Sequence, residues 1–387
     1  MSKAGEDPAT LLARAGVGCD PAYHGIAPPL WSSDTNEWRS PTQKPDYDYS
    51  RTVNPNRDLL LDALASLEGA VGGAITSSGQ SAALLALLLL KDGSLVVAPH
   101  DCYGGTYRLL QGLAERGTLT VRFIDQNDEH AVSEALGCKP ALVWIESPSN
   151  PLLRLVDVER LCTQAHLAGA LVIADNTLAT PCRQQPIALG CDLVMHSTTK
   201  ALNGHHDLFG GALLAKDPEL AERISWWANA AGLSASAFDC WQVLRGLRTL
   251  TLRVERQEAS ALGIARWLAD RNDVLDVHYP GLSSHPQSEL AARQQQGPGF
   301  ILSFRVKGGE VAVRKFVGAL ELITLASSLG GFSTLICTPS SMTHRGMPPE
   351  AQEAADIFPD LLRLSVGLEE GQDLIADLGH AFAALSD

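Results

Sequence analysis

Residues 141–174, which read ALVWIESPSNPLLRLVDVERLCTQAHLAGALVIA, decide the fold of this chain. The run 141–145 is apolar and has the length of a buried strand, and 171–174 is a second run of this kind. Between them, Asp157 is suited to begin a helix that ends at Gly169. A strand, a helix and a strand in this order form a βαβ unit with parallel strands. The stretch therefore predicts an α/β fold.

The same alternation continues on both sides of this unit. From about residue 60 to 250, apolar runs of strand length alternate with amphipathic stretches, which is typical of a parallel sheet with helices on both faces. One apolar run, Ala82 to Leu90, predicts a buried helix beginning at Ala82. Because that run is too short to cross a bilayer and no longer one occurs, we expect no membrane span.

The ends of the chain differ from its middle. The sequence before residue 60 is rich in Pro, Asp and Ser and lacks periodicity, so it predicts an extended arm that reaches a neighbouring subunit. A long helix is expected over about 238–270, followed by shorter units in which 300–304 is a strand. We therefore expect three parts: an arm over 1–60, a large domain over 61–250 and a small domain over 251–387.

Composition excludes several classes of function. The chain has 387 residues, 45% of them hydrophobic, and a net charge of −14 without a basic block, so nucleic acid is not an expected partner. The N-terminus lacks the apolar stretch of a secretion signal, which indicates a cytoplasmic protein. The eight cysteines form no C-x-x-C pair, and His205-His206 has no second pair at ligand spacing. We expect reduced cysteines and no metal.

Polar segments follow three of the expected strands. They are Glu146 to Pro151, Asp175 to Thr177, and His196 to Lys200. In open α/β sheets, ligands bind beyond the carboxyl ends of the strands. These three segments are therefore candidates to share one site.

Three features of the sequence point to the same ligand. Lys200, behind the hydroxyl residues 197–199, is suited to form a Schiff base, although a lysine at a strand end is commonly a solvated loop residue. The segment 76–81 leads into an apolar helix whose start can bind a phosphate, although it also serves as an ordinary cap. Asp175 can pair with a protonated pyridine nitrogen or with an arginine. Together they indicate pyridoxal phosphate (PLP).

Several segments then resemble the Cys/Met-metabolism family of PLP-dependent enzymes. The resemblance covers roughly residues 20 to 385. It rests on Asp48 to Arg51 with Asn54-Pro55, Tyr103 to Arg108, Glu146 to Pro151, Ala174 to Thr177, Ser197 to Lys200, Ser328 to Gly331, Met342 to His344, and Arg363 to Glu369. It implies the type I fold of PLP-dependent transferases, with a mainly parallel seven-stranded sheet in the large domain and a smaller α/β C-terminal domain.

The resemblance also implies a role for individual residues. Lys200 and Tyr103 would be catalytic, the first as the Schiff-base lysine that moves protons and the second by stacking on the ring. The implied cofactor-binding residues are Tyr49, Arg51, Ser78, Gly79, Gln80, Tyr103, Asn150, Asp175, Thr177, Ser197, Thr199 and Lys200. The implied substrate-binding residues are Tyr49, Arg108, Asn150, Ser327, Ser328 and Arg363. Arg363 would bind the α-carboxylate, and Tyr49 and Arg51 would come from the adjacent subunit of a tetramer built as a dimer of dimers.

The implied reaction is γ-replacement on an O-acyl-L-homoserine, taken as O-succinyl-L-homoserine, by a thiol such as L-cysteine, which gives L-cystathionine. Departures from the family pattern concentrate around the substrate. Ser327 stands where γ-synthases carry a glutamate, Thr52 where a second arginine is frequent, and Ala201 where tyrosine often follows the lysine. Elimination from a related sulfur amino acid and sulfhydrylation therefore remain alternatives, and a non-enzymatic regulatory role has no sequence feature in its favour.

Overall fold

The computed structural model describes residues 7–385, which form two compact units. Unit 1 comprises residues up to Lys91 together with Gln185–Thr251, and unit 2 comprises Asp92–Gln184 together with the residues from Leu252 onward. Each unit is thus built from two separate segments of the chain. The predicted parts 1–60, 61–250 and 251–387 are each one continuous stretch of the chain, unlike these two units. That division stays a prediction.

Unit 1 carries three strands of the large seven-stranded sheet, in the order β1-β7-β6. β7 is antiparallel to both neighbours, and its pairing joins Gly72 to Ala215. α3 packs on β7, and α2 packs on α8. The elements are α1 (Pro8–Arg14), α2 (Pro55–Glu68), β1 (Gly72–Thr76), α3 (Gly79–Leu87), β6 (Leu193–His196), β7 (Gly211–Ala215), α7 (Pro218–Ala230) and α8 (Ala237–Leu247).

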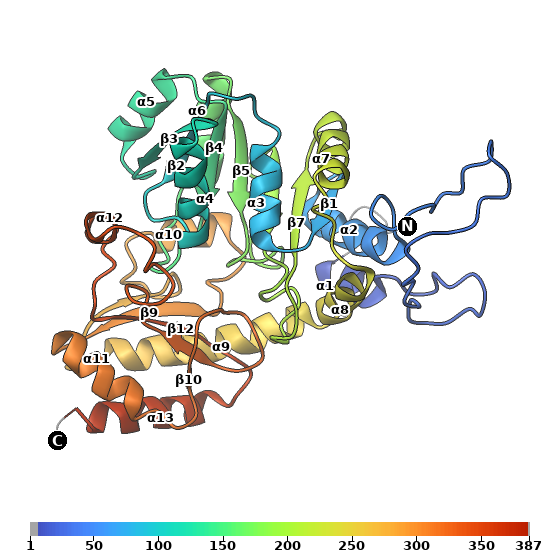
Figure 1. Ribbon diagram of the computed structural model, residues 1–387. Coiled ribbons are helices and arrows are strands. Elements are labelled where there is room, and N and C mark those ends of the chain that lie inside the picture. Colours follow the sequence, from blue (N-terminus) through green and yellow to red (C-terminus); the bar gives the residue numbers. More distant parts are fainter. Residues whose placement is uncertain (1–6, 386–387) are drawn as a thin grey trace. The chain divides into compact units, whose positions relative to one another are not determined.

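Unit 2 carries the other four strands of this sheet, in the order β5-β4-β2-β3, and all of their pairings are parallel. Figure 1 shows α4, α5 and α6 beside these strands. The elements are β2 (Ser94–Pro99), α4 (Gly104–Glu115), β3 (Leu119–Ile124), α5 (Glu129–Gly137), β4 (Leu142–Glu146), α6 (Val158–Leu167) and β5 (Leu171–Asp175). The mixed α/β class and the mainly parallel seven-stranded sheet are thereby confirmed.

A second sheet in unit 2 has five strands in the order β10-β11-β12-β9-β8. Alternate residues of β9 and β12, such as Phe304 and Leu364, pack into a core with α9, α11 and α13 (Figure 1). The elements are α9 (Leu250–Ala269), β8 (Val274–His278), α10 (Ser288–Gln294), β9 (Ile301–Val306), α11 (Gly309–Gly318), β10 (Thr324–Leu325), β11 (Leu335–Cys337), α12 (Pro349–Ala354), β12 (Leu361–Ser365) and α13 (Gly371–Ala383).

Local signals of the sequence explain most element boundaries. The predicted βαβ stretch is confirmed as β4, α6 and β5, and the Asp157 side chain accepts the Arg160 N–H at the start of α6. The helix expected from Ala82 begins earlier, at Gly79, because the Ser78 hydroxyl accepts the Ser81 N–H and caps it there.

The single long helix expected over about 238–270 is wrong. The structure has α8 and α9, separated at Arg248 and Thr249. The Thr249 N–H and hydroxyl both lie 3.3 Å from Gly246 O, so this residue closes a tight turn instead of continuing the helix. A hydroxyl side chain that binds nearby backbone competes with the helical pattern in this way.

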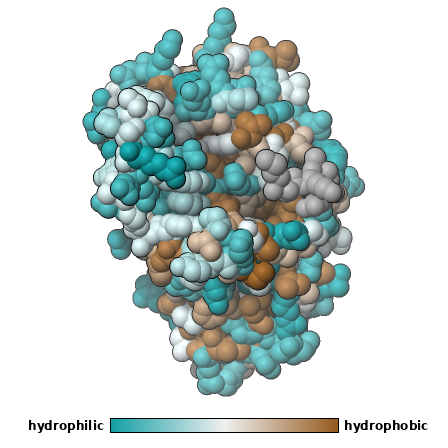
Figure 2. Space-filling model, turned by 90° about the vertical axis from the view of Figure 1, so that its right-hand side faces the viewer, coloured by the Kyte–Doolittle hydropathy of each residue, from teal (hydrophilic) through white to brown (hydrophobic). Residues whose placement is uncertain are grey.

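The N-terminal region is mostly irregular between Ala15 and Asn54, where the described residues form only isolated bridges such as Thr35 with Tyr49. It is not extended throughout, because α1 begins after the cap Asp7 and α2 begins after the cap Asn54. Several large hydrophobic side chains stay exposed here, among them Tyr23, Ile26 and Trp38. The face that lies at the right of Figure 1 shows hydrophobic residues scattered among hydrophilic ones (Figure 2).

Candidate active site

In unit 1, Lys200 lies in a tight turn that follows β6. Its N–H donates to Ser197 O at 3.2 Å, and its own carbonyl accepts the Gly204 N–H at 2.8 Å. The Thr199 hydroxyl donates to Gly210 O at 3.2 Å and also accepts the Gly210 N–H at 3.0 Å. The first two bonds fix the turn that carries the half-buried lysine, and the two Thr199 bonds join this turn to Gly210, the residue that precedes β7.

The start of α3 approaches the same turn. A Cβ added at Gly79 would lie 2.8 Å from the Cβ of Ser197, so only glycine permits this approach. Ser78 caps the helix through the Ser81 N–H, and among residues 7–385 the N–H groups of Gly79 and Gln80 have no hydrogen-bond partner. Free N–H groups at a helix start bind anions, and the Ser197 and Thr199 hydroxyls lie on the neighbouring turn. This arrangement fits a phosphate group.

A buried pair holds the strand that leads to Lys200. His196, the last residue of β6, and Glu68, the last residue of α2, are both inaccessible to solvent, and His196 Nε2 lies 2.6 Å from Glu68 Oε1. The pair fixes the end of β6 to α2. Sequence reasoning missed it, because the two residues are far apart in the chain and no local pattern connects them.

Tyr49 and Arg51 lie together against α7 in unit 1. Arg51 Nη1 donates to the carbonyl and to the side-chain oxygen of Asn229, both at 2.8 Å, and its guanidinium lies 5.5 Å from the Tyr49 ring centre. Thr52 Oγ1 also lies 3.3 Å from Asn229 Oδ1. Both Tyr49 and Arg51 are exposed, so they are accessible to another molecule.

In unit 2, Tyr103 and Asn150 are joined by a residue to which sequence reasoning gave no role. Glu146 ends β4, where its Oε2 accepts the Tyr103 N–H at 2.8 Å and its Oε1 accepts the Asn150 N–H at 3.2 Å. Tyr103 immediately precedes α4, and its ring is partly exposed. The position of Glu146 at the end of an expected strand, in the polar segment 146–151, was the feature of the sequence that could have indicated a role for this residue.

Asp175 lies beside Glu146 at the carboxyl end of the sheet. The two residues are register partners in the parallel pair β4 and β5, and the Asp175 carboxylate accepts the Thr177 N–H at 3.0 Å. Burial raises the pKa of Glu146 well above its ordinary value, and the negative charges of Asp175 and Asp101 raise it further. A cationic ring nitrogen at Asp175 would relieve part of this repulsion, which fits the predicted pyridine partner.

Arg363 is a buried cation of unit 2. Because β12 buries Leu362 and Leu364 in the core of the small sheet, Arg363 faces the opposite side. Its Nη1 donates to Asn150 Oδ1 at 3.0 Å and its Nη2 to Ser328 O at 2.6 Å. Its Nε has no partner, and among the described residues no carboxylate forms an ion pair with it. A buried guanidinium whose Nε–H is unused is suited to bind an anionic ligand.

Ser328 and His344 complete the surroundings of Arg363. Ser328 has a φ of 86°, which is rare for a residue other than glycine, and its carbonyl is held by the arginine. Burial, together with the positive charge of Arg363, lowers the pKa of His344 to about 4. His344 is therefore neutral at physiological pH and adds no second positive charge. Sequence reasoning included it only in the Met342 to His344 segment and gave it no role.

The structure does not bring every predicted substrate residue into this cluster. Ser327 is exposed and precedes Ser328 without a bond to Arg363. Arg108 is exposed on α4, and a Cβ at Gly346 would lie 2.9 Å from its Cδ, so its packing partner is the loop after β11. Within residues 7–385, no carboxylate forms an ion pair with Arg108.

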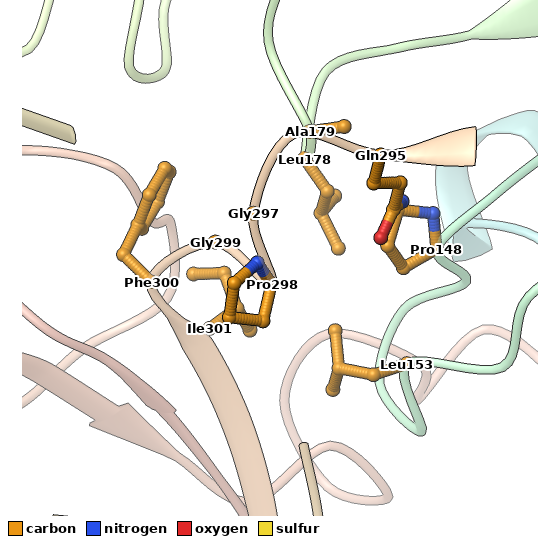
Figure 3. A pocket seen from close by; sticks show the side chains of 10 residues that line it. All are labelled: Pro148, Leu153, Leu178, Ala179, Gln295, Gly297, Pro298, Gly299, Phe300 and Ile301. Carbon is orange, nitrogen blue, oxygen red and sulfur yellow. The ribbon is translucent and has the colours of Figure 1, made fainter. Parts of the chain in front are cut away.

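Unit 2 also contains a small cavity next to the loop that carries Asn150 (Figure 3). Its space for water-sized molecules is about 10 Å³, which is room for roughly one water molecule. Gln295 Oε1 is buried without a hydrogen-bond partner. The lining residues are Pro148, Leu153, Leu178, Ala179, Gln295, Gly297, Pro298, Gly299, Phe300 and Ile301. The cavity is too small for an amino acid or a cofactor.

Two other kinds of feature are absent within residues 7–385. No helix in that range is long and apolar enough to cross a membrane. No group of three or more His, Cys, Asp and Glu side chains in the same range is placed to hold a metal ion.

The chain belongs to the family of Cys/Met metabolism PLP-dependent enzymes, whose family model matches residues 9–383. The predicted family, the enzyme class and the cofactor are confirmed by this match. Taken separately, each unit has groups that PLP requires: unit 1 has a lysine on the turn that the start of α3 approaches, and unit 2 has a strand-end carboxylate suited to a protonated ring nitrogen.

Individual relatives are similar to the chain over almost its whole length. The chain is 48% identical over 377 residues to a cystathionine gamma-synthase of Escherichia coli, covering 97% of this chain and 98% of that protein. A crystal structure of a cystathionine gamma synthase from Xanthomonas oryzae pv. oryzae is 46% identical with a TM-score of 0.97, over 98% of this chain and 99% of that one. A cystathionine beta-lyase of Coxiella burnetii is 40% identical over 96% of this chain and 97% of that protein.

Proposed function

We propose that this chain catalyses γ-replacement on an O-acyl-L-homoserine, with L-cysteine as the thiol and L-cystathionine as the product. The observation that carries the proposal is Arg363, a buried guanidinium with an unused Nε and no carboxylate partner among the described residues. An amino-acid α-carboxylate supplies the missing anion. The Xanthomonas oryzae relative was crystallised in complex with cystathionine, which supports the product.

PLP, when bound, supplies an electron sink that stabilises the carbanion left when a proton leaves the substrate's α-carbon. The phosphate would be held by the N–H groups of Gly79 and Gln80, after the Ser78 cap, and by the Ser197 and Thr199 hydroxyls. Asp175 would keep the ring nitrogen protonated, with Thr177 and Asn150 beside the ring and Tyr103 covering it.

The remaining steps belong to side chains of this protein. The Lys200 amine would hold the cofactor before substrate arrives and then move protons at the α- and β-carbons. Arg363 would bind the α-carboxylate, with Asn150 and Ser328 holding its guanidinium. The acyl group would leave Cγ as a carboxylate, the thiol sulfur would form the new bond there, and Arg108 would receive a negatively charged acyl group such as succinyl.

The test is a product assay on purified holoenzyme. O-succinyl-, O-acetyl- and O-phosphohomoserine are each incubated with L-cysteine, and cystathionine is measured by mass spectrometry. We expect the fastest formation with the succinyl ester, and none when Lys200 is replaced by alanine. A wild-type protein that holds one PLP per chain and forms no thioether from any of the three esters would contradict the proposal.

Elimination is the second candidate, and Ser327 is the observation that favours it. This exposed serine stands where the resembling γ-synthases carry a glutamate, and relatives of this chain include a cystathionine beta-lyase. The experiment is Ser327→Glu, with the α-keto acid and ammonia measured against cystathionine. We expect the variant to shift the ratio toward cystathionine. An unchanged ratio would show that Ser327 does not set the choice.

We also propose a homo-oligomer in which Tyr49 and Arg51 serve the cofactor of a second copy, within a tetramer built from two dimers. Both side chains are exposed beside α7, and Tyr23 and Ile26 of the same N-terminal segment leave 90% and 74% of their surface exposed. In a mixing test, Arg51→Ala and Lys200→Ala proteins are unfolded and refolded together. Restored activity is expected, and equal inactivity of mixed and separate samples would refute the shared site.

A cytoplasmic location is proposed on the state of the cysteines. All eight are thiols outside any disulfide, including the exposed Cys138. Free thiols are typical of a reducing compartment.

A further inference from the structure

The carboxyl group of Glu146 lies between two loops of unit 2 that carry candidate site residues. One oxygen accepts the Tyr103 N–H at 2.8 Å, and the other accepts the Asn150 N–H at 3.2 Å. Only 2% of Glu146 is exposed, so water does not replace either bond. Because each oxygen is used by a different loop, the carboxyl group sets the spacing between these two backbone amides.

Further bonds continue this connection toward Arg363. Asn150 Oδ1 accepts Arg363 Nη1 at 3.0 Å, so Glu146 holds the backbone of the residue whose side chain orients the arginine. A second bond, from the Ser149 hydroxyl to Asp101 Oδ2 at 2.7 Å, joins the same two loops. The spacing of Tyr103 and Asn150 is therefore fixed by two buried carboxyl groups and not by the loops alone.

Glu146 differs from an ordinary buried ion-pair residue. Glu258, in the same unit, accepts Arg183 Nε at 2.9 Å, whereas no cation in the described residues forms an ion pair with Glu146. The charged groups that face Glu146 are Asp175 on β5 and Asp101 after β2, both negative. A carboxyl group kept in such surroundings without a cation costs stability, unless its two amide bonds serve the loops they hold.

We propose that Glu146 is a positioning residue of the active site. Through one carboxyl group it sets the distance between Tyr103, which covers the cofactor ring, and the Asn150–Arg363 pair, which binds the substrate carboxylate. The inference rests on the proposed function for the roles of Tyr103 and Arg363. Its two carboxyl oxygens hold the backbone amides of Tyr103 and Asn150, and Glu146 acts by keeping these two residues at a fixed spacing.

The test variant is Glu146→Gln, whose single acceptor oxygen serves one amide while its NH₂ group opposes the other N–H. Two affinities are measured: that of PLP, and that of L-alanine, followed through the visible absorbance of the bound cofactor. L-alanine has the α-carboxylate but no leaving group at Cγ. We expect both dissociation constants to rise about 10- to 100-fold, because small displacements of positioning groups have effects of this size.

The matched control is Asp377→Asn. Asp377 lies in the same unit, is buried, and accepts the backbone N–H groups of Glu321, Leu322 and Ile323. This variant also loses a buried carboxylate that accepts backbone N–H groups. We therefore expect a lower melting temperature and unchanged affinities for PLP and L-alanine. If Glu146→Gln behaves in the same way, Glu146 is merely structural and the proposal is overturned.

A double-mutant cycle isolates the route through Asn150. If Glu146 acts through this residue, the effect of Glu146→Gln on L-alanine affinity shrinks in an Asn150→Ala background, whereas additive effects overturn the proposal. Glu146→Asp, one methylene shorter, is the second variant, and failure of both variants to fold would also overturn it. Because wild-type affinities are the reference, these readouts remain decisive even if no cystathionine is formed.

Discussion

The two units hold their candidate residues by different means. In unit 1, the groups around Lys200 are fixed by a helix start, a glycine contact with Ser197 and hydroxyl bonds to the backbone. In unit 2, the groups around Arg363 are fixed by buried charged side chains. Two of these, Glu146 and Asp175, are register partners at the ends of β4 and β5. Backbone geometry tolerates a change of side chain, whereas buried charges do not. We therefore expect substitutions around Lys200 to act on the cofactor, and those around Arg363 to act on the substrate and on pH dependence.

The largest effect is expected at Lys200, where one side chain of unit 1 carries the chemistry. Lys200→Ala should lower turnover by about 10³-fold or more, because the proton-moving amine is lost. PLP should still bind, since the phosphate contacts remain, but it should be removable by dialysis. Absorbance after dialysis and product formation are the measurements. If the variant turned over substrate as fast as the wild type, Lys200 would not be the residue that moves the protons.

The next largest effect is expected in unit 2. Arg363→Lys should raise KM for the homoserine ester about 100-fold, because a point charge replaces a planar fork and leaves Asn150 Oδ1 poorly matched. PLP affinity should stay within about threefold, less than 1 kcal/mol. The matched control is Arg305→Lys, which changes an arginine bonded to both oxygens of Asp360 outside the candidate site. If Arg363→Lys and Arg305→Lys had the same KM, Arg363 would not be a substrate-binding residue.

A smaller effect is expected for Gly79→Ala in unit 1. The added methyl group would lie 2.8 Å from Ser197 Cβ and force the two segments apart. Such overpacking costs about 1–3 kcal/mol, so PLP affinity should fall about tenfold or more, with KM for the ester little changed. Gly112→Ala, on α4 where the added Cβ has no neighbour within 4 Å, is the control and should slightly stabilise the protein. Fluorescence titration of apoprotein with PLP measures the difference.

The smallest effect concerns pH and stability in unit 2. The folded-state pKa of His344, about 4, lies below the unfolded value near 6.5. Between these values the unfolded chain binds more protons, so the contribution is complete above about pH 6.5 and is lost as pH falls toward 4. The pKa difference corresponds to about 3 kcal/mol. Denaturant unfolding from pH 7 to 4 should show a shallower loss of stability for His344→Gln than for the wild type.

The control for this prediction is His130→Gln, at an exposed position on α5. It should reproduce the wild-type dependence of unfolding free energy on pH. If His344→Gln and His130→Gln have the same pH profile, the depressed pKa of His344 does not contribute to acid sensitivity.

Local signals of the sequence predicted the elements that position the cofactor residues. Asp157 and Ser78 cap their helices, the apolar runs of β4 and β5 are strands, and the polar segments follow strand ends. These features depend on neighbours within a few residues, so they can be recognised in the chain itself. The β4–α6–β5 unit and the family follow from them.

Features that depend on distant residues were not predictable in this way. The bond between Glu68 and His196 and the packing of Gly79 on Ser197 join segments more than 100 residues apart. The break between α8 and α9 depends on Thr249, whose hydroxyl competes with a pattern that otherwise favours one helix. The segment containing Glu146 was recognised, but its carboxyl group gained a role only when Tyr103 and Asn150 were seen on its two oxygens.

The division of each unit into two chain segments affects how the protein is made. β1 pairs with β7, and α3 packs on β7, yet residues 92–184 of the other unit are synthesised between these partners. At ordinary translation rates the delay is on the order of ten seconds. During this time the apolar α3 segment emerges from the ribosome without β6 and β7, which it contacts in the native fold. A nascent chain of this design is a natural client for a holding chaperone, and pauses before residue 211 should increase its aggregation.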